Sequence, residues 1–261
     1  MTTGHNEDAG GFSAPFRVRF DEAAPDGRLR TSGLLRYAQD LAWIHSDALG
    51  FDRGWYREHR LTWLVRAANL AVLGGIPVGA GLTGTTRVVG FRRVWSRRHS
   101  EFHDAAGGLA ATVDIDWVLV DDRGVPTRIP AIFETTFSVP AGTLVLGRVA
   151  LDDPPDDAHH QPFTVRPQEL DPMAHVNNAV YADWIDEAVI AAGDPGAVGA
   201  IPRAMRLEYA LAAEPGATLE GRAWTDVAGW SFRLADAAGA EMLRARLEPV
   251  ASDAAPASVE G

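Results

Sequence analysis

The sequence predicts an α+β protein made of two tandem units, each with one long helix and a set of antiparallel strands. The first observation is a repeat: the segment from Phe16 aligns without a gap on the segment from Phe163, an offset of 147 positions (163 − 16). Both copies read as a short strand, a turn and an amphipathic helix. The second observation is that β-rich segments follow each helix, with turn residues between them. A length of 261 residues accommodates two such units.

Each helix is predicted from apolar residues that recur at helical spacing. The stripe of the first helix, with Thr31 or Ser32 as the predicted N-cap, contains Leu34, Leu35, Ala38, Leu41, Ala42 and His45. The stripe of the second, with Asn177 or Asn178 as N-cap, contains Tyr181, Trp184, Ile185, Ala188 and Val189. The strands of the first unit are expected in 61–73, 83–95, 100–104 and 110–122, and those of the second in 202–212, 218–227, 230–237 and 241–250.

The unit boundaries follow from these elements and from clusters of Pro and Asp between them. We expect the first unit in residues 15–140, a linker in 141–162 and the second unit in 163–250. Residues 1–14 and 251–261 are expected to be flexible tails.

Composition excludes several classes of protein. Without cysteine, the chain can have no disulfide, thiol nucleophile or zinc-thiolate site. No apolar run is long enough for a membrane helix and no signal peptide is evident, so we expect a cytoplasmic protein that does not enter a membrane. All 24 basic residues are Arg. Residues 1–148 contain 17 Arg and 16 Asp or Glu, whereas residues 149–261 contain 7 Arg and 19 Asp or Glu. The net charge of −11 disfavours nucleic acid as a partner.

Two motif-like patterns are weak. The segment Gly79–Gly84 matches G-x-G-x-x-G, but the residues after it alternate like a strand where a dinucleotide site needs a helix. His99, Glu101 and His103 share one face of a strand, which we interpret as an exposed polar face, so no metal is predicted.

The informative stretch is LDPMAHVNNAVYADWIDEA, residues 170–188. Asp171 lies in the turn before the second helix, and His175, Asn177 and Asn178 crowd the N-terminus of that helix. A carboxylate beside unpaired helix N–H groups can activate water or attack an ester while the N–H groups hold the oxyanion. These residues could equally be helix caps and a turn, and their spacing alone leaves both interpretations open.

The pattern D-x-x-x-H-V-N-N-x-x-Y-x-x-W-x-x-E resembles the signature of the acyl-acyl carrier protein (acyl-ACP) thioesterases of plants and bacteria. Further segments follow that family's order: 25–51, 61–72, the Arg97–Arg98 pair and 115–130. The resemblance implies two tandem hotdog units, each a curved sheet around its long helix. The first unit would shape the acyl-chain cavity and the second would carry the catalytic residues, here Asp171, His175, Asn177 and Asn178.

Not every functional residue of that family has a counterpart in this sequence. The family's Asn falls on Met173, and its Glu and Cys fall on Ala212 and Ala213. Glu208 or Glu214, placed on the strand face of position 212, could substitute for the missing carboxylate.

The implied activity is hydrolysis of fatty acyl-ACP to a free fatty acid, without a cofactor. An acyl-CoA thioesterase and a weakly catalytic acyl-binding protein remain alternatives. The carrier is acidic, so we expect it to bind the densest basic run, formed by Arg87, Arg92, Arg93, Arg97 and Arg98. Fused hotdog units imitate a dimer of single units, so a monomer or a homodimer would fit.

Overall fold

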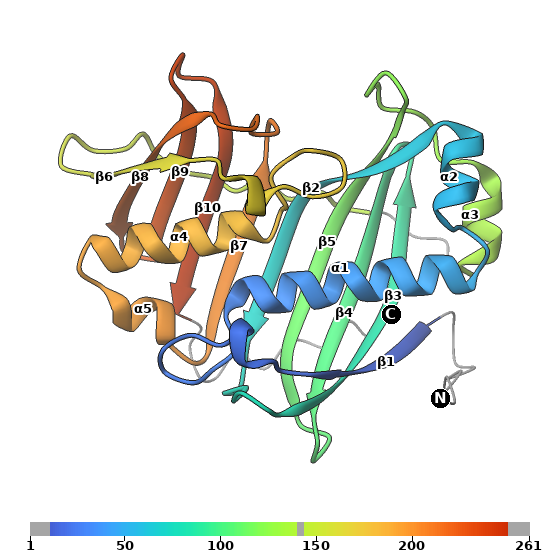
Figure 1. Ribbon diagram of the computed structural model, residues 1–261, viewed down its shortest axis with the longest axis horizontal. Helices are drawn as coiled ribbons and strands as arrows, with labels where there is room; N and C mark the ends of the chain where they lie inside the picture. The colour runs from blue at the N-terminus through green and yellow to red at the C-terminus, as the bar shows by residue number, and fades with distance from the viewer. Residues whose placement is uncertain (1–10, 140–143, 250–261) are drawn as a thin grey trace.

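The strands form one continuous sheet in the computed structural model, which describes residues 11–139 and 144–249 (Figure 1). The strands of the first unit are β1 (Gly11–Arg17), β2 (Leu61–Val72), β3 (Gly81–Arg92), β4 (Trp95–Asp104) and β5 (Leu109–Asp121). Those of the second are β6 (His159–Thr164), β7 (Arg203–Tyr209), β8 (Thr218–Asp226), β9 (Gly229–Asp236) and β10 (Glu241–Pro249). The order across the sheet is β1-β3-β4-β5-β2-β7-β10-β9-β8-β6. The second half thus repeats the first in reverse, and the predicted repeat is confirmed.

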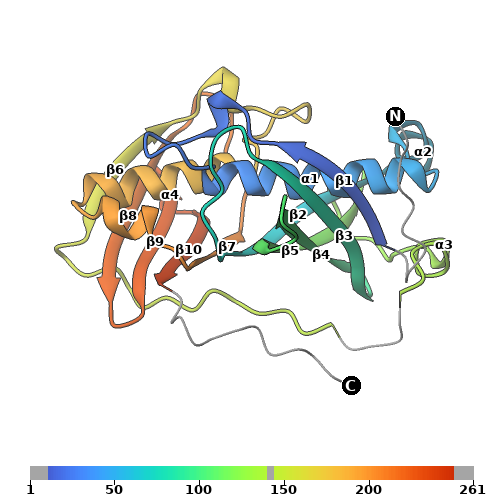
Figure 2. The same cartoon turned by 90° about the horizontal axis from the view of Figure 1, so that it is seen from below.

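Both long helices lie on the same face of this sheet (Figures 1 and 2). They are α1 (Thr31–Ala48) in the first unit and α4 (Val180–Ala191) in the second. The short helices are α2 (Arg53–His59), α3 (Ala131–Thr136) and α5 (Pro195–Gly199), and the 3₁₀ turns are η1 (Phe20–Glu22) and η2 (Pro167–Glu169). None of the described helices is long and apolar enough to cross a membrane.

The repeat extends to individual hydrogen bonds. In η1 the backbone N–H of Arg19 donates to Glu22 at 2.9 Å, and in η2 the N–H of Arg166 donates to Glu169 at 2.7 Å. These two bonds lie 147 positions apart, as the alignment requires. The same local pattern therefore sets the chain direction before each long helix.

The two units join where β2 pairs with β7 in antiparallel register. At this junction Arg36 of α1 binds Asp183 of α4, with Nη2 and Oδ2 3.2 Å apart. The two residues occupy equivalent positions in the repeat. The units are therefore related as the subunits of a symmetric dimer would be, with equivalent residues meeting at the axis.

A glycine lies beneath α1 and lets this helix approach the sheet closely, and a glycine in the second unit makes room for an aromatic ring. A Cβ on Gly84 of β3 would lie 2.8 Å from Leu41 and 2.9 Å from Phe16. A Cβ on Gly221 of β8 would lie 2.7 Å from the ring of Phe163. Gly84 ends the G-x-G-x-x-G pattern, and the strand that follows confirms that this pattern is no dinucleotide turn.

The predicted caps are wrong for both long helices. Thr31 is the first residue of α1, and the N-cap position is Arg30, without a side-chain cap bond. The N-cap of α4 is Ala179, because Asn177 forms its own turn one step earlier: its Oδ1 accepts the Ala179 N–H at 2.9 Å.

The unit boundaries differ from those expected. β1 begins at Gly11, inside the expected tail of residues 1–14, because residues 11–17 pair with β3. The expected linker of 141–162 overlaps β6, which pairs with β8 from His159 onward. Residues 1–10, 140–143 and the expected tail of 251–261 lie outside the described residues.

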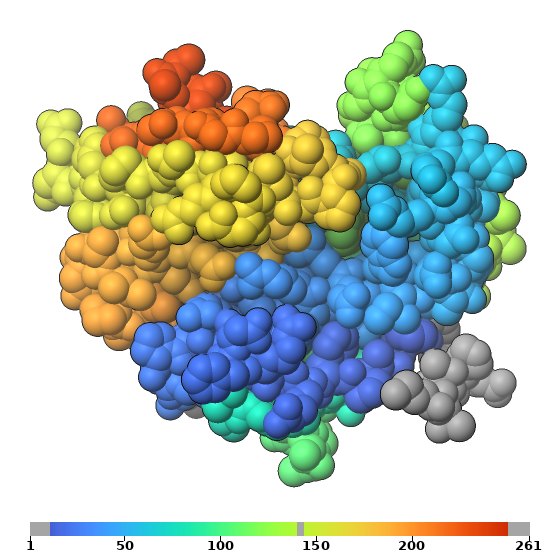
Figure 3. All heavy atoms as spheres, viewed as in Figure 1, coloured from blue at the N-terminus to red at the C-terminus, as the bar shows by residue number. Residues whose placement is uncertain are grey.

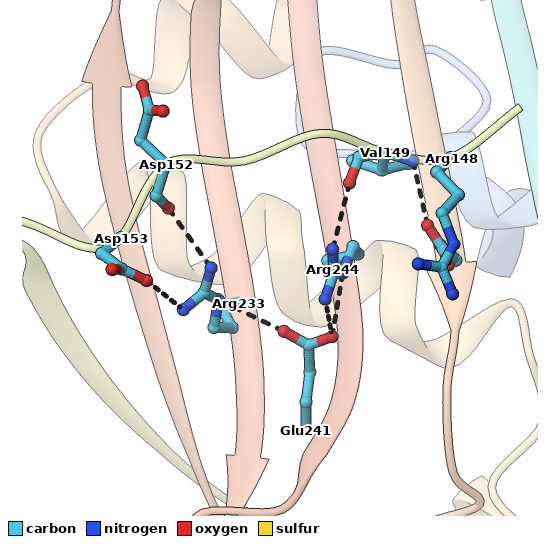
Figure 4. A network of polar contacts seen from close by, with 8 residues as sticks. Arg148, Val149, Asp152, Asp153, Arg233, Glu241 and Arg244 are labelled. Carbon is cyan, nitrogen blue, oxygen red and sulfur yellow. Dashed lines mark hydrogen bonds and ion pairs between the residues drawn. The ribbon is translucent and has the colours of Figure 1, made fainter.

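The described part of the linker runs along the face of the sheet opposite to the helices (Figure 2). Figure 4 shows how strand side chains hold it. Arg233 donates to the Asp152 carbonyl at 3.3 Å and pairs with Asp153 at 3.4 Å. Arg244 donates to the Val149 carbonyl at 3.5 Å. These contacts hold the connection between the units on the face of the sheet that the helices do not cover.

Candidate active site

A cavity of about 850 Å³ lies where the two units meet. The first unit contributes residues of α1, α2, β2 and β4 to its lining, together with Phe133 and Phe137. The second unit contributes Asp171, Pro172, Met173, His175, Val176, Asn177, Asn178, Tyr181, Tyr209, Leu211 and Ala212. In Figure 3 the surface is hollowed where the yellow and gold part of the second unit meets the cyan part of the first. All four predicted catalytic residues therefore border one cavity.

The turn at Asp171 holds its carboxylate in place. Oδ1 accepts the N–H of Met173 at 2.8 Å and, in a longer contact of 3.4 Å, the N–H of His175. The backbone N–H of Asp171 donates to the His175 carbonyl at 2.8 Å, which closes the turn. Oδ2 has no hydrogen-bond partner within the described part of the chain. One carboxylate oxygen thus fixes the geometry and the other is free to accept a proton.

The backbone between this turn and α4 leaves two donors without a protein acceptor in the described residues, the N–H groups of Val176 and Asn178. The Asn177 N–H donates to the Glu169 carbonyl at 2.8 Å. The Asn178 carbonyl accepts the hydroxyl of Tyr209 at 2.9 Å, whereas the Asn178 N–H meets no protein acceptor among residues 11–139 and 144–249. This N–H lies next to the positive end of the α4 dipole. It is therefore a candidate donor to an oxyanion.

Two buried tyrosines support this backbone segment. Tyr181 of α4 and Tyr209 of β7 lie with their ring centroids 5.5 Å apart, and the Ala213 N–H donates to the Tyr181 hydroxyl at 3.3 Å. Burial raises the pKa of Tyr181 to about 12, with a further contribution from the charge of Asp171. Burial also raises the pKa of Tyr209. Both side chains remain neutral at physiological pH. The sequence predicted a core position for Tyr181, and the residue is buried, but it also lines the cavity.

The first-unit end of the cavity is aromatic. Phe51 stacks on Phe133 with centroids 4.4 Å apart and on Phe137 at 5.7 Å. Trp63 and Phe91 pack on the same cluster. Such a wall favours an apolar chain and offers little to a polar ligand.

Two family models match this sequence. The acyl-ACP thioesterase N-terminal domain matches residues 10–132, and the acyl-ACP thioesterase C-terminal domain matches residues 152–234. The chain belongs to the acyl-ACP thioesterase family. It is therefore a thioester hydrolase with the double hotdog fold of that family.

Solved structures share this fold over nearly the whole chain. A protein from Lactobacillus plantarum described as an oleoyl thioesterase superposes with a TM-score of 0.82 at 20% identity, covering 94% of this chain and 98% of the other. The 12:0-ACP thioesterase from Umbellularia californica gives a TM-score of 0.76 at 21% identity, covering 92% and 96%. An uncharacterised protein of Mycobacterium tuberculosis is 25% identical over 179 residues, 67% of this chain and 69% of the relative.

Within this acyl-ACP thioesterase, the first copy of the repeated turn has no carboxylate at the position of Asp171; its carboxylate, Asp26, lies two residues further on and accepts the Arg28 N–H at 2.9 Å. Ala24 occupies the position equivalent to Asp171, and its N–H donates to the Arg28 carbonyl at 2.7 Å just as that of Asp171 donates to His175. The backbone turn is the same in both copies, so the copies differ in the side chains that the turn carries.

The residues expected to replace the family's missing Glu do not border the cavity. The Glu208 carboxylate accepts the Val149 N–H at 2.9 Å, where the linker crosses the sheet. Glu214 is exposed in a loop, because β7 ends at Tyr209 and the predicted strand face does not reach position 212. Neither position suits an auxiliary carboxylate. Ala212 does line the cavity, and Met173, which is 44% exposed, lies at its rim.

The arginines predicted to bind the carrier are divided between the surface and the interior. Three are exposed: Arg87, Arg92 and Arg93. Arg97 binds Asp116 through Nε and Oδ1 at 2.6 Å and through Nη2 and Oδ2 at 2.8 Å. Arg98 faces the opposite side of β4 and is only 6% exposed. Arg98 cannot contact a carrier protein, so this part of the prediction is wrong.

The His99, Glu101 and His103 row is held by polar contacts on β4. His99 Nδ1 lies 2.8 Å from Asp114, and its Nε2 lies 3.2 Å from Glu101. These contacts raise the pKa of His99, the Asp114 hydrogen bond contributing most. No cluster of three or more His, Asp or Glu suited to a metal occurs within the described ranges.

Proposed function

We propose that this thioesterase cleaves fatty acyl-ACP to a free fatty acid and holo-ACP, with Asp171 as the catalytic carboxylate. The observation that carries the proposal is the shared cavity. It connects the aromatic wall of the first unit with the free Oδ2 of Asp171 and the Asn178 N–H of the second. An acyl chain held along the first unit would bring its thioester carbon to the turn before α4.

In the proposed reaction, Asp171 accepts a proton from water as the water oxygen attacks the thioester carbon. The carbonyl oxygen gains negative charge and accepts the Asn178 N–H. The C–S bond then breaks, and the proton on Asp171 passes to the departing thiolate. Direct attack by Asp171, giving an anhydride that water hydrolyses, uses the same groups. The His175 side chain would orient the substrate carbonyl from the cavity wall.

We place the carrier protein at α2. Arg53 and Arg57 are one turn apart on this helix, both are exposed, and both border the cavity. Neither forms an ion pair within the described part of the chain, whereas nearby Arg60 binds Asp122. Trp43, 54% exposed, lies beside Arg53, whose guanidinium is 5.8 Å from the indole centroid. An acidic carrier bound here would have its phosphopantetheine arm at the cavity mouth.

The docking surface is tested with two matched pairs of charge reversals. Arg53→Glu with Arg57→Glu should lower the ratio of acyl-ACP to acyl-pantetheine turnover at least about 10-fold, and the loss should shrink with salt as the Debye length falls below about 8 Å. Arg87→Glu with Arg92→Glu removes as many charges from the β3–β4 region and should leave that ratio unchanged. If the second pair lowers the ratio and the first does not, the carrier binds at the β3–β4 surface around Arg87 and Arg92.

The activity itself is tested by comparing esters of one acyl group on ACP and on coenzyme A. We expect a higher kcat/KM for the ACP ester, because the carrier adds contacts at α2. A higher value for the coenzyme A ester would identify an acyl-CoA thioesterase. Binding of both esters without release of a thiol would identify an acyl-binding protein, the alternative that Met173, Ala212 and Ala213 suggest.

A carrier-protein substrate agrees with a cytoplasmic location. The two units already supply both halves of one cavity, so we propose that a monomer is sufficient for activity. Dilution below the concentration at which any homodimer dissociates should leave the specific activity constant.

A further inference from the structure

A buried guanidinium lies on the wall of the cavity. Arg98 of β4 is 6% exposed. Its Nη1 lies 2.8 Å from His45 Nδ1, its Nη2 lies 3.4 Å from Ser46 Oγ, and its Cζ lies 5.3 Å from the centroid of the Phe137 ring. No carboxylate lies within 4.0 Å of Arg98 in residues 11–139 and 144–249. Two of five donors have partners, and neither partner is charged.

His45 does not compensate this charge. Burial and, to a lesser extent, the neighbouring guanidinium lower the pKa of His45 to about 3, so its imidazole is neutral and accepts through Nδ1. Burial lowers the pKa of Arg98 to about 10, which still leaves it protonated at physiological pH. The hydroxyl of Tyr56, the other titratable group nearby, is neutral because burial raises its pKa. A net positive charge is therefore enclosed by aromatic side chains, which is costly without an anion.

This charge lies at the end of the cavity remote from Asp171. Arg36, Gln39, Trp43 and Ser46 line the cavity along one face of α1. Arg36 is at the junction with α4, the helix that follows the catalytic turn, whereas Ser46 contacts Arg98. Ser46 follows Arg36 by ten positions, which corresponds to about 15 Å along the helix. An acyl chain that starts at the turn and follows α1 would thus direct its distal end toward Arg98.

We propose that Arg98 makes this end of the cavity a subsite for an acyl group that carries an oxygen at its distal end. The inference rests on the proposed function, because it assumes that the acyl chain follows α1. A distal hydroxyl or keto oxygen would accept one of the free N–H groups, and a distal carboxylate would also supply the missing negative charge. A methyl end offers neither and would leave the guanidinium desolvated.

The substrate test uses matched thioesters on one carrier, ending in methyl, hydroxyl or carboxylate, over a series of chain lengths. At the optimal length, kcat/KM should be at least about 10-fold higher for the carboxylate-ended chain than for the methyl-ended chain, with the hydroxyl-ended chain between them. Arg98→Met should abolish this preference, and Arg98→Lys, which retains a cation, should keep part of it. A wild-type preference for methyl ends at every length overturns the subsite.

A binding measurement separates the two proposals. If no thioester is hydrolysed, the proposed function fails, and the subsite is then decided by thermal shifts with free acids of equal length. A dicarboxylic acid that stabilises the wild-type protein more than the monocarboxylic acid supports the subsite, and equal or smaller stabilisation refutes it. The same comparison on the wild-type protein decides the matter if Arg98→Met fails to fold.

Discussion

Replacing Asp171 by Asn separates its proposed catalytic role from its part in the turn. Asn retains an Oδ1 that can accept the Met173 N–H, now at 2.8 Å, so the free energy of unfolding should change by less than about 0.5 kcal/mol. Ala loses this acceptor and should cost about 1 kcal/mol. Both variants lose the oxygen proposed to accept the proton. Turnover should therefore fall at least about 100-fold in each, equivalent to about 2.7 kcal/mol of transition-state stabilisation.

The assay is release of the carrier thiol, read with a thiol reagent. This enzyme contains no cysteine, so it contributes no background signal. Urea unfolding of both variants supplies the stability comparison. The reasoning is refuted if Asp171→Asn retains turnover within about threefold of wild type, or if only the destabilised Ala variant loses activity, which would make Asp171 a structural turn residue.

Three further predictions concern packing, pH and the tyrosine support. Gly84→Ala places a Cβ 2.8 Å from a leucine methyl group of α1 and should cost about 1–3 kcal/mol in urea unfolding, whereas Gly81→Ala, with nothing within 4 Å, should be nearly neutral. Burial raises the pKa of Asp186 to about 7, so the folded state binds the proton of this carboxyl more tightly than the unfolded state does. The contribution of protonated Asp186 to the stability of the folded state is therefore lost as the pH rises from about 4 to 7. Asp186→Asn should therefore become more stable relative to wild type over that interval, and a constant difference would contradict the assignment. Tyr209→Phe removes the hydroxyl bound to the Asn178 carbonyl and should lower kcat by up to about 10-fold with little change in KM; an unchanged kcat would exclude this support.

The repeat and the turn at Asp171 were predictable because they depend on local pattern. The bond from the Arg19 N–H to Glu22 recurs from Arg166 to Glu169, so similar residues build the same turn twice. Asp171 was recognisable because a carboxylate just before a helix is a chemical signal that sequence spacing preserves.

The positions of the other predicted site residues depend on contacts between segments that are distant in the sequence. Glu208 has the spacing of a cavity residue, but the linker crosses the outer face of the sheet and binds its carboxylate. Arg97 and Arg98 are adjacent in a basic run, yet alternation along β4 places one beside Asp116 and the other inside the cavity. The Arg98 position could have been inferred from that alternation, whereas the linker path could not.

The most direct test of the account is a crystal structure with a non-hydrolysable acyl-pantetheine analogue. The account predicts the carbonyl oxygen within hydrogen-bond distance of the Asn178 N–H, the carbonyl carbon next to Oδ2 of Asp171, and the acyl chain along α1. An acyl chain bound in the second unit alone, or a carbonyl group remote from the turn before α4, would contradict it.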